Sequence, residues 1–405
     1  MTVRTGWRSP TVVLLAGSLI IVLGMGIRAS FGIFQRPMIA DLGWSREAFA
    51  LAIALQQILW GVMQPVLGAV ADKFGTARVV IASALMYTGG LLLMGYGGSL
   101  LTFDIGAGFM VGFGIAGTGF GVVMAAIARA FPPERRSLVF GIGTAAGSLG
   151  QLTMIPLGQA FIDLHGWSMA LGLFAVIALL VIPLSAPIRG KPEVENGPDQ
   201  PLGVALREAA THRGFLMLAA GYFVCGFQIA FMTAHFPAYL VDNGLSPAIG
   251  ATALALVGGF NIIGSFTAGV LGQKRRKKYL LSWIYLARAI AVTAFMVIPL
   301  SGASALVFSA VMGLFWLSTV PLTTGLVGQI FGLRYLATLS GLVFFSHQVG
   351  SFLGVWLGGL LFDLTGSYNV VWWLGVVLAL MAAAINLPID DRTLRRDARP
   401  AAVGA

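Results

Sequence analysis

Stretches of about 20 or more apolar residues recur along the whole chain, separated by short segments that carry charged residues, glycine or proline. Each stretch is long enough to cross a hydrocarbon core of about 30 Å as an α-helix. The pattern predicts an all-α membrane protein with twelve transmembrane helices, at residues 11–35, 46–70, 78–98, 102–129, 137–161, 168–187, 214–240, 247–271, 279–299, 303–328, 337–362 and 369–388.

The composition excludes a water-soluble protein. Of the 405 residues, 58% are hydrophobic and only 10% are charged, whereas a soluble domain carries about 25% charged residues. The first apolar run continues to Phe34, which is longer than the apolar core of a signal peptide, so we expect it to be retained as a helix. Cys225 is the only cysteine, which rules out an intramolecular disulfide and a cysteine-based metal site. We expect no cofactor and no metal.

One long polar stretch divides the chain. Residues 189–213 are rich in charge, proline and glycine, and they predict a linker with a short surface helix at 202–211. The expected organisation is a six-helix half at 1–188, the linker at 189–213, a second six-helix half at 214–390 and a tail at 391–405.

The basic residues predict the orientation in the membrane. The net charge is +10, and with both termini inside, 21 of the 25 Lys and Arg residues lie on the cytoplasmic face. We therefore expect both termini and the linker in the cytoplasm and the protein in the cell (inner) membrane. This distribution over short loops also excludes nucleic acid as the reason for the charge. The run at 273–278 can contact anionic lipid, although topology alone explains it.

The two halves repeat in sequence. At an offset of 200, seven residues of the fifth predicted span and its end recur in the eleventh: Gly141, Gly150, Leu157, Gly158, Asp163, Leu164 and Gly166 correspond to Gly341, Gly350, Leu357, Gly358, Asp363, Leu364 and Gly366. At an offset of 201, Gly68 corresponds to Gly269. Parallel repeats of this kind are typical of transporters in which two halves rock about a central site.

The loop between the second and third spans holds a recognisable motif. Gly68, Asp72, Lys73, Gly75 and Arg78 have the spacing Gly-x-x-x-Asp-Lys-x-Gly-x-x-Arg. This loop resembles the signature loop of the major facilitator superfamily, and the twelve-helix plan is similar over nearly the whole chain. The resemblance implies that these five residues close the inner gate when the carrier opens outward. Gln273 stands where a second acid would be, so the second half lacks an equivalent.

Within that superfamily, the chain resembles the monocarboxylate and oxalate–formate porters. The similarity lies in Gly26-Ile-Arg-Ala-Ser-Phe-Gly-Ile-Phe34 and in Gly43-Trp-Ser-Arg-Glu47. Those carriers have a lysine near the position of Arg28. Two departures are Asn261 and Ser265, where the eighth span of such carriers has Asp and Arg, and His347, where the oxalate–formate type has a lysine. One fixed cation suits a monoanion better than a dicarboxylate.

Polar residues within the spans are the candidate substrate site, because burying them in a membrane is costly. Arg28 can form bidentate bonds with a carboxylate, and His235 and His347 can carry a proton. Each of them can equally serve helix packing or snorkel to the interface. Arg288, in the ninth span, is expected to be structural. The remaining candidates on interior helix faces are Gln57, Gln151, Gln228, Asn261 and Thr323.

These observations predict a secondary transporter, not an enzyme. Its substrate would be a small organic anion, a monocarboxylate above all, carried by proton symport or by exchange. No phosphate-binding loop for ATP is present. The alternatives are an antiporter that exports drugs or metabolites and a membrane receptor that does not transport. We expect a monomer in contact with membrane lipid and with no nucleic-acid partner.

Overall fold

The computed structural model describes residues 9–190, 201–332 and 335–394. Residues 191–200 of the predicted linker and residues 395–405 of the predicted tail lie outside these ranges. Within the described ranges all regular structure is helical. This confirms the all-α prediction.

The first half contains helices α1 to α10. Their bounds are α1 Pro10–Ala29, α2 Phe31–Leu42, α3 Arg46–Phe74, α4 Thr76–Tyr96, α5 Leu100–Phe103, the π-helix η1 Asp104–Met110, α6 Val111–Thr118, α7 Phe120–Arg129, α8 Pro133–His165, α9 Trp167–Leu179 and α10 Val181–Leu184. The surface helix predicted at 202–211 is α11, Leu202–Thr211.

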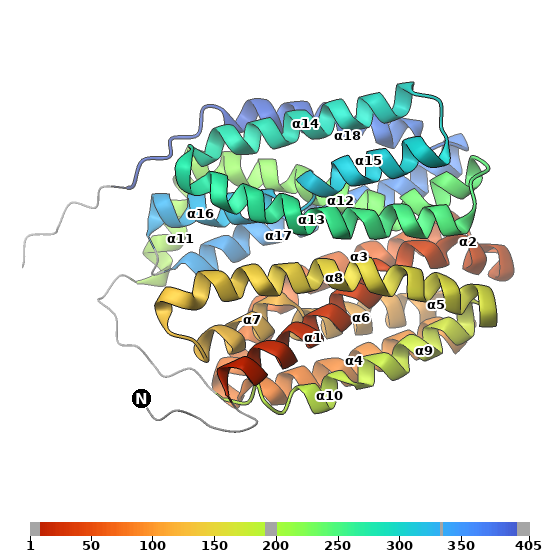
Figure 1. Cartoon of the computed structure of the whole chain (residues 1–405), viewed down its shortest axis with the longest axis horizontal. Helices are drawn as coiled ribbons and strands as arrows, with labels where there is room; N and C mark the ends of the chain where they lie inside the picture. The colour runs from red at the N-terminus through yellow and green to blue at the C-terminus, as the bar shows by residue number, and fades with distance from the viewer. Residues whose placement is uncertain (1–8, 191–200, 333–334, 395–405) are drawn as a thin grey trace, which may run out of the picture.

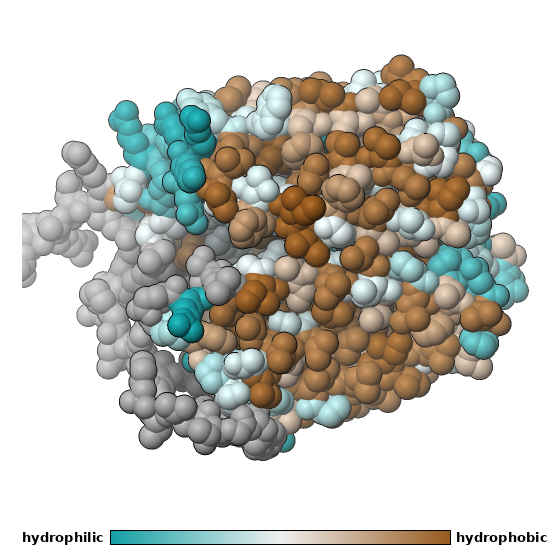
Figure 2. All heavy atoms as spheres, in the orientation of Figure 1, coloured by the Kyte–Doolittle hydropathy of each residue, from teal (hydrophilic) through white to brown (hydrophobic). Residues whose placement is uncertain are grey.

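The second half contains helices α12 to α18. Their bounds are α12 Arg213–Asp242, α13 Pro247–Lys274, α14 Lys277–Val297, α15 Gly302–Phe315, α16 Thr319–Phe331, α17 Leu336–Thr365 and α18 Asn369–Asn386. In the described part of the chain, eleven continuous or nearly continuous helical segments are long and apolar enough to cross a membrane. The 33-residue α8 is the twelfth helix of spanning length. Figure 2 shows the resulting apolar band between hydrophilic groups at the two ends.

Four predicted spans are interrupted, and the sixth of the twelve breaks at Leu180, between α9 and α10. The first breaks at Ser30, between α1 and α2. The fourth contains η1 and a second break at Gly119, and the tenth breaks between Phe315 and Thr319. Hydropathy cannot detect such breaks, because the residues on either side remain apolar. Helix breaks inside a membrane persist only where protein groups satisfy the freed backbone atoms.

The sequence repeat has a structural counterpart. A Cβ on Gly150 of α8 would lie 2.2 Å from the carbonyl O of Val22 in α1, and one on Gly350 of α17 would lie 2.0 Å from the carbonyl O of Phe223 in α12. Both glycines therefore allow the same close helix contact, once in each half.

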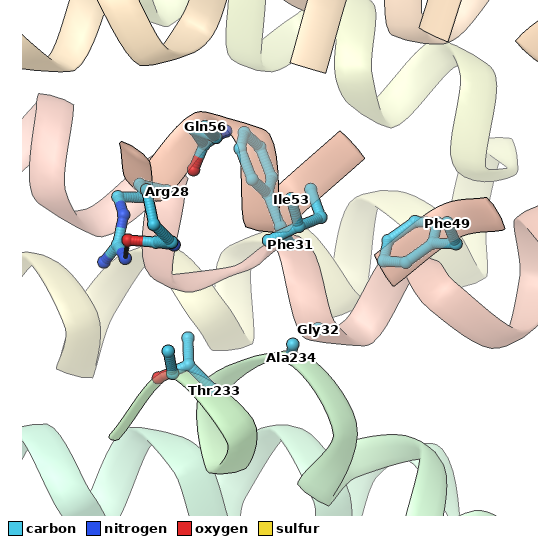
Figure 3. A pocket seen from close by; sticks show the side chains of 10 residues that line it. Arg28, Phe31, Gly32, Phe49, Ile53, Gln56, Thr233 and Ala234 are labelled. Carbon is cyan, nitrogen blue, oxygen red and sulfur yellow. Dashed lines mark hydrogen bonds between the residues drawn. The ribbon is translucent and has the colours of Figure 1, made fainter. Parts of the chain in front are cut away.

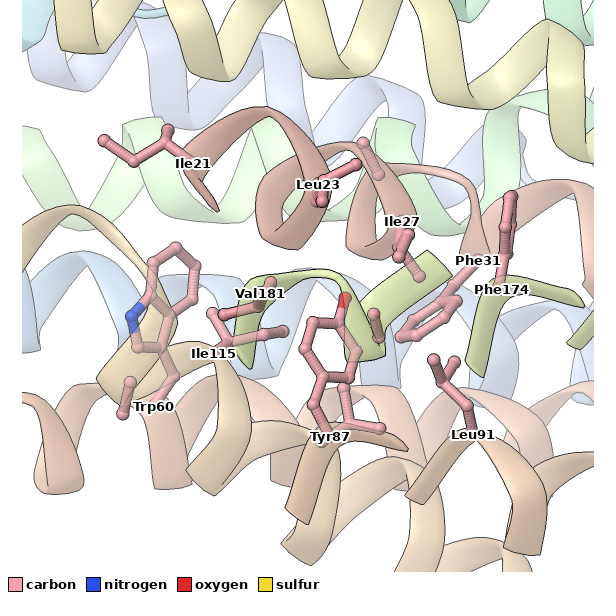
Figure 4. Close-up of a cluster of buried hydrophobic side chains, with 14 of the residues drawn as sticks. Ile21, Leu23, Ile27, Phe31, Trp60, Tyr87, Leu91, Ile115, Phe174 and Val181 are labelled. Carbon is pink, nitrogen blue, oxygen red and sulfur yellow. The ribbon is translucent and has the colours of Figure 1, made fainter. Parts of the chain in front are cut away.

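One apolar core lies mainly in the first half and extends across the seam to Ala230, Ala234, Ala251, Leu254 and Val355, and a second lies within the second half. Figure 4 shows part of the first, where Tyr87 of α4 and Ile115 of α6 pack beneath α1. The Tyr87 hydroxyl donates to the carbonyl O of Gly24, at 2.9 Å. The halves meet where α3 contacts α17, α8 contacts α13 and α2 contacts α12 (Figure 1). This seam between the halves holds the candidate site.

The two ends of the bundle differ. At one end α1 begins, α18 ends and α11 lies; we call it the linker end (Figure 1). The opposite end, where α3 begins and α17 ends, we call the far end.

Candidate functional site

Arg28 lies in the last turn of α1, directly before the break at Ser30. Its Nη2 donates to Oε1 of Gln57 on α3 at 2.6 Å, and its guanidinium lies 4.7 Å from the ring centroid of Trp60. Its Nε is buried and has no hydrogen-bond partner among the described residues. Nor does any described carboxylate lie within ion-pair distance of the side chain. Arg28 therefore keeps a positive charge and an unused donor between the halves.

Residues of α17 meet Arg28's partners from the other side of the seam. Nε2 of Gln348 donates to the main-chain carbonyl of Gln57 at 3.1 Å, and the ring of Phe344 packs against Trp60, with centroids 5.3 Å apart. His347 stacks on Phe344, with centroids 5.8 Å apart. We call Arg28, Gln57, Trp60, Phe344, His347 and Gln348 the central cluster. It joins a fixed cation of the first half to a histidine of the second.

Toward the far end the central cluster is closed. Figure 3 shows a small space between Arg28 and Gln56 on one side and Thr233 and Ala234 of α12 on the other. Its cavity volume is about 10 Å³, room for about one water molecule. A Cβ on Gly32 of α2 would lie 2.0 Å from the carbonyl O of Thr233, so α2 and α12 are in direct contact. A solute cannot pass here in this conformation.

A network of polar contacts between the halves closes the far end further. Arg46 of α3 pairs with Asp242 of α12 at 2.6 Å, and Arg36 of α2 pairs with the same carboxylate at 3.1 Å. Arg46 also donates to the Tyr368 hydroxyl at 2.7 Å. The Asp363 carboxylate accepts the main-chain N–H groups of Arg46 and Glu47, at 3.2 and 2.7 Å.

Three more residues complete what we call the far-end network. Nδ1 of His235 lies 3.1 Å from Nε2 of Gln35, and the indole N–H of Trp356 donates to Glu47 at 3.2 Å. The contact between Gln35 and His235 joins α2 of the first half to α12 of the second. His235, predicted to bind substrate or proton, belongs to this closed end.

Toward the linker end the facing helices separate. Among the described residues, no atom of another helix lies within 4 Å of the position that a Cβ would take on Gly68 of α3, Gly141 of α8, Gly269 of α13 or Gly341 of α17. In contrast, Gly61 of α3 and Gly359 of α17, nearer the far end, would clash across the seam, with Gln348 and Arg46 respectively. At these positions the described helices therefore stand further apart at the linker end than near the far end.

Comparison with known proteins agrees with this geometry. Residues 14–355 match the family model described as Major Facilitator Superfamily. The chain belongs to the major facilitator superfamily. It is accordingly a multi-pass membrane transporter, not an enzyme.

Relatives and solved structures extend this result. The chain is 26% identical to the MFS-type transporter YcxA of Bacillus subtilis, over 96% of this chain and 97% of the relative. It is also 26% identical to human monocarboxylate transporter 11, over 84% of this chain and 73% of that protein. The crystal structure of a bacterial homologue of the human lysosomal transporter Spinster, in an inward-facing and unoccupied conformation, has a TM-score of 0.74, with 16% identity, 95% of this chain and 97% of that chain covered. The last similarity supports the major facilitator fold.

Other predicted site residues lie on the second seam, between α8 and α13. Gln151 donates to the carbonyl O of Leu254 at 2.9 Å, and Asn261 donates to the Ser148 hydroxyl at 2.7 Å. The Asn261 side-chain oxygen also accepts the main-chain N–H of Leu317, in the break between α15 and α16. Thr323 is buried on α16. Gln151 and Asn261 thus join the two halves at this seam, whereas Thr323 lies on a helix that packs within the second half.

Gln228 and Arg288 are used within the second half. Arg288, fully buried on α14, donates to the main-chain carbonyls of Phe315 and Trp316, and its contact with Phe315 is 2.5 Å. It thus satisfies the backbone at the helix break, as expected for a structural residue. Gln228 donates to the carbonyl O of Gly375 at 3.0 Å and lies 3.5 Å from Arg288. Its side chain is therefore bound between α12, α14 and α18, away from the central cluster.

The predicted inner-gate residues of this superfamily loop lie at the linker end. Gly75 makes the turn between α3 and α4 with a φ of 99°, a region that favours glycine. Asp72 lies 3.9 Å from Arg129 of α7, and Lys73 and Arg78 are exposed. Arg129 is a partner that the motif did not predict. In this conformation Asp72 pairs within the first half.

The far-end residues Arg46, Asp242, Asp363 and Tyr368 were not predicted as functional. Asp363 did carry a signal, since it belongs to the repeated Asp-Leu-x-Gly. Arg46 lay within the segment that resembles monocarboxylate carriers. Charged residues at span ends are so often topology signals that neither observation predicted an ion pair across the seam.

Proposed function

We propose that this transporter carries a small organic monocarboxylate, bound at Arg28, by alternating access with proton symport or exchange. The observation that carries the proposal is the state of Arg28. Its guanidinium is between the halves, has an unused buried donor and has no described carboxylate partner. A charge left without a partner in a low-dielectric site binds an opposite charge strongly.

The chemistry of the central cluster fits a monoanion. The planar guanidinium offers two donors to one carboxylate, while Trp60 and Phe344 provide an apolar wall for a short carbon chain. In the second half, Arg288 is also buried within a span, but it already donates to main-chain carbonyls. A second carboxylate would therefore lack a fixed cation among the described residues of the cluster. The relatives named monocarboxylate transporters add support to this substrate class.

We further propose that the linker end faces the cytoplasm, as the basic residues predict. The conformation described above is then open to the cytoplasm and closed outside by the far-end network. Outward opening would separate that network and bring the linker end together, where Asp72, Lys73 and Arg78 would act. Gly68 and Gly75 allow the helix approach and the turn that such closure needs.

The test is binding and transport by purified protein. A thermal-shift and calorimetry screen compares short monocarboxylates, dicarboxylates, amines and lipophilic cations, and proteoliposomes then measure uptake of each ligand found. We expect monocarboxylates to bind, and Arg28→Ala to weaken that binding by about 30-fold or more, since losing one partner of a desolvated charge pair costs about 2–5 kcal/mol. Arg28→Lys should retain part of the affinity, because the charge remains but the planar fork is lost.

Arg207→Ala is the matched control, because Arg207 is an exposed arginine on α11. It should bind and transport as the wild type does. If the wild type binds amines or lipophilic cations and no carboxylate, the anion proposal is wrong. The same conclusion follows if folded Arg28→Ala retains wild-type affinity for a carboxylate.

A further inference from the structure

We propose that Nε2 of His347 is the proton-binding atom of the transport cycle, and that Gln348 is the positioning residue that exposes this atom. The inference rests on the function proposed above, which leaves open whether transport uses protons and which histidine would bind them. It is argued from three hydrogen bonds that fix the tautomers of the two buried histidines.

The orientation of the Gln348 amide follows from its partner. The main-chain carbonyl of Gln57 can only accept, so the group 3.1 Å from it must be the NH₂ of Gln348. The Gln348 oxygen, Oε1, then points to Nδ1 of His347, at 3.0 Å. Because that oxygen can only accept, Nδ1 carries the hydrogen.

The free lone pair of neutral His347 is therefore on Nε2. This atom is buried and accepts no hydrogen bond from an N–H or O–H group of the described residues, and His347 as a whole is 7% exposed. The neighbouring Cys225 thiol is only a weak donor. A buried acceptor without a strong donor is unfavourable, and a proton would remove that deficit if a negative charge came close. Nε2 of His347 is thus a base held ready inside the central cluster.

His235 has the opposite tautomer and no free atom. Its Nε2 lies 2.7 Å from the carbonyl O of Val355, so Nε2 carries the hydrogen. Its Nδ1 faces the Gln35 amide at 3.1 Å and the Tyr368 hydroxyl at 3.3 Å. The Arg46 guanidinium is bound to the same hydroxyl and opposes a second positive charge. The closed far end therefore holds His235 neutral and fully bonded, which fits a gate contact.

The groups around His347 leave its charge to be set by the solute. From α12, the Tyr222 ring lies 4.8 Å from the imidazole, and the Cys225 thiol lies beside it. From α3, Gln57 reaches it through Gln348, and from α1 Arg28 reaches it through Gln57. From α14, Arg288 acts on the Cys225 thiol, but its guanidinium is bound to main-chain carbonyls. The fixed charge on the path through Gln57 is the Arg28 cation. A carboxylate on Arg28 would neutralise that cation and so favour a proton on His347.

Proton and anion then bind cooperatively, and by thermodynamic linkage each raises the affinity of the other equally. With a carboxylate on Arg28 and a proton on His347, the site has a net charge of about +1, the same as the empty site with a neutral His347, so anion and proton enter together without a change of charge. The contact from Gln348 to Gln57 crosses the seam, so parting α3 from α17 would release the imidazole from its held tautomer. Proton affinity would thereby depend on the conformational state, as symport requires.

The test uses full-length protein in proteoliposomes that contain a pH-sensitive dye. Three quantities are measured with one monocarboxylate: its affinity against pH, its exchange without a gradient, and its accumulation driven by an imposed pH gradient together with dye acidification. We expect wild-type affinity to rise as the pH falls. In His347→Gln, gradient-driven accumulation should fall at least tenfold more than exchange, and the affinity should lose its pH dependence.

Two further variants separate positioning from structure. Gln348→Met removes the nearer acceptor for Nδ1 and leaves only the Ser351 hydroxyl, at 3.4 Å, so the pH midpoint of affinity should shift. Gln348→Glu restores a close acceptor and should restore a titrating response. His235→Gln should retain the pH dependence even if turnover is slower. His165→Gln, an exposed histidine at the end of α8, is the neutral control.

The outcomes distinguish the two proposals. If the wild type binds no carboxylate, the proposed function fails. If it binds and exchanges a carboxylate but shows no gradient-driven accumulation, the anion proposal stands and the proton site is wrong. The proton site is also wrong if His347→Gln accumulates solute and acidifies the lumen as the wild type does, or if His235→Gln alone removes the pH dependence.

Discussion

Asp363 offers a direct test of how the far end is held closed. Its carboxylate, at the end of α17, accepts hydrogen bonds from the main-chain N–H groups of the first two residues of α3, in the other half. These contacts join a negative charge to the N-terminus of a helix, where the helix dipole favours an anion. Asp363→Asn keeps the shape of the side chain and removes its charge, so it measures how much the interaction between that charge and the N-terminus of α3 contributes.

The expected magnitude follows from the geometry. A hydrogen bond to a charged group contributes about 1.5–3 kcal/mol, but the Asp363 side chain is solvent-exposed, so screening reduces the value. Asn can still accept one of the two N–H groups. We therefore expect a loss of about 1–2 kcal/mol from the closed far end, which shifts the equilibrium toward its open form by a factor of about 5–30.

The chain contains its own control. Asp163 is the equivalent of Asp363 in the repeat, and its carboxylate accepts from Gln159 on the same helix, at 2.8 Å. No hydrogen bond or ion pair of Asp163 with the second half is present among the described residues. Asp163→Asn should therefore leave the far end closed, while Asp363→Asn should open it.

The assay is a distance measurement between spin labels. Labels at Leu164→Cys and Ala303→Cys lie at exposed far-end positions of the two halves, in a Cys225→Ser background. Asp363→Asn should enlarge the fraction of long distances relative to the parent and to Asp163→Asn. If all three distributions coincide, Asp363 does not hold the far end. If Asp163→Asn opens it equally, the effect is not specific to the contact across the seam.

Three further predictions concern topology, the inner gate and the second half. A reporter fused after Ala405 should be active only in the cytoplasm; activity only in the periplasm would invert the proposed orientation. Asp72→Asn should slow turnover by about 5- to 150-fold with little change in solute affinity, as a gate coupling of about 1–3 kcal/mol implies, and wild-type turnover would exclude the gate role. Arg288→Met should lower the unfolding temperature in detergent, with a loss of about 2–5 kcal/mol from two carbonyls left without a donor, yet change solute affinity less than threefold; a larger loss of affinity would place Arg288 in the site.

The sequence predicted the spans well because membrane burial imposes a strong and regular pattern. It could not place the breaks at Ser30, Gly119 and Phe315–Thr319, which depend on partners far away in the chain. The clearest case is the tenth span, whose break is stabilised by Arg288 from another helix. The arginine was visible in the sequence, but the carbonyls that it binds were not.

The candidate site divides in the same way. A buried arginine between the halves was predictable from the cost of charge in a membrane, and so was Gln57 on the interior face of its helix. The hydrogen bond from Arg28 to Gln57 was not predictable, because it depends on the register between α1 and α3. The two histidines looked equivalent in sequence. Only their partners, a main-chain carbonyl for His235 and the Gln348 side chain for His347, give them different tautomers.

The repeat explains why these chemical groups are distributed as they are. Two similar halves give the transporter two ends that can close in turn, but a symmetric site would carry the same groups twice. Here the offset of 200 pairs His347 with Gly147 and Asp363 with an Asp163 that stays on its own helix, and neither Gln228 nor Ile229, at offsets of 200 and 201 from Arg28, is basic. The first half thus supplies the fixed cation, and the second supplies the free base and the carboxylate that caps α3. Anion and proton would therefore meet only where both halves contribute, so movement of one half against the other changes both affinities at once.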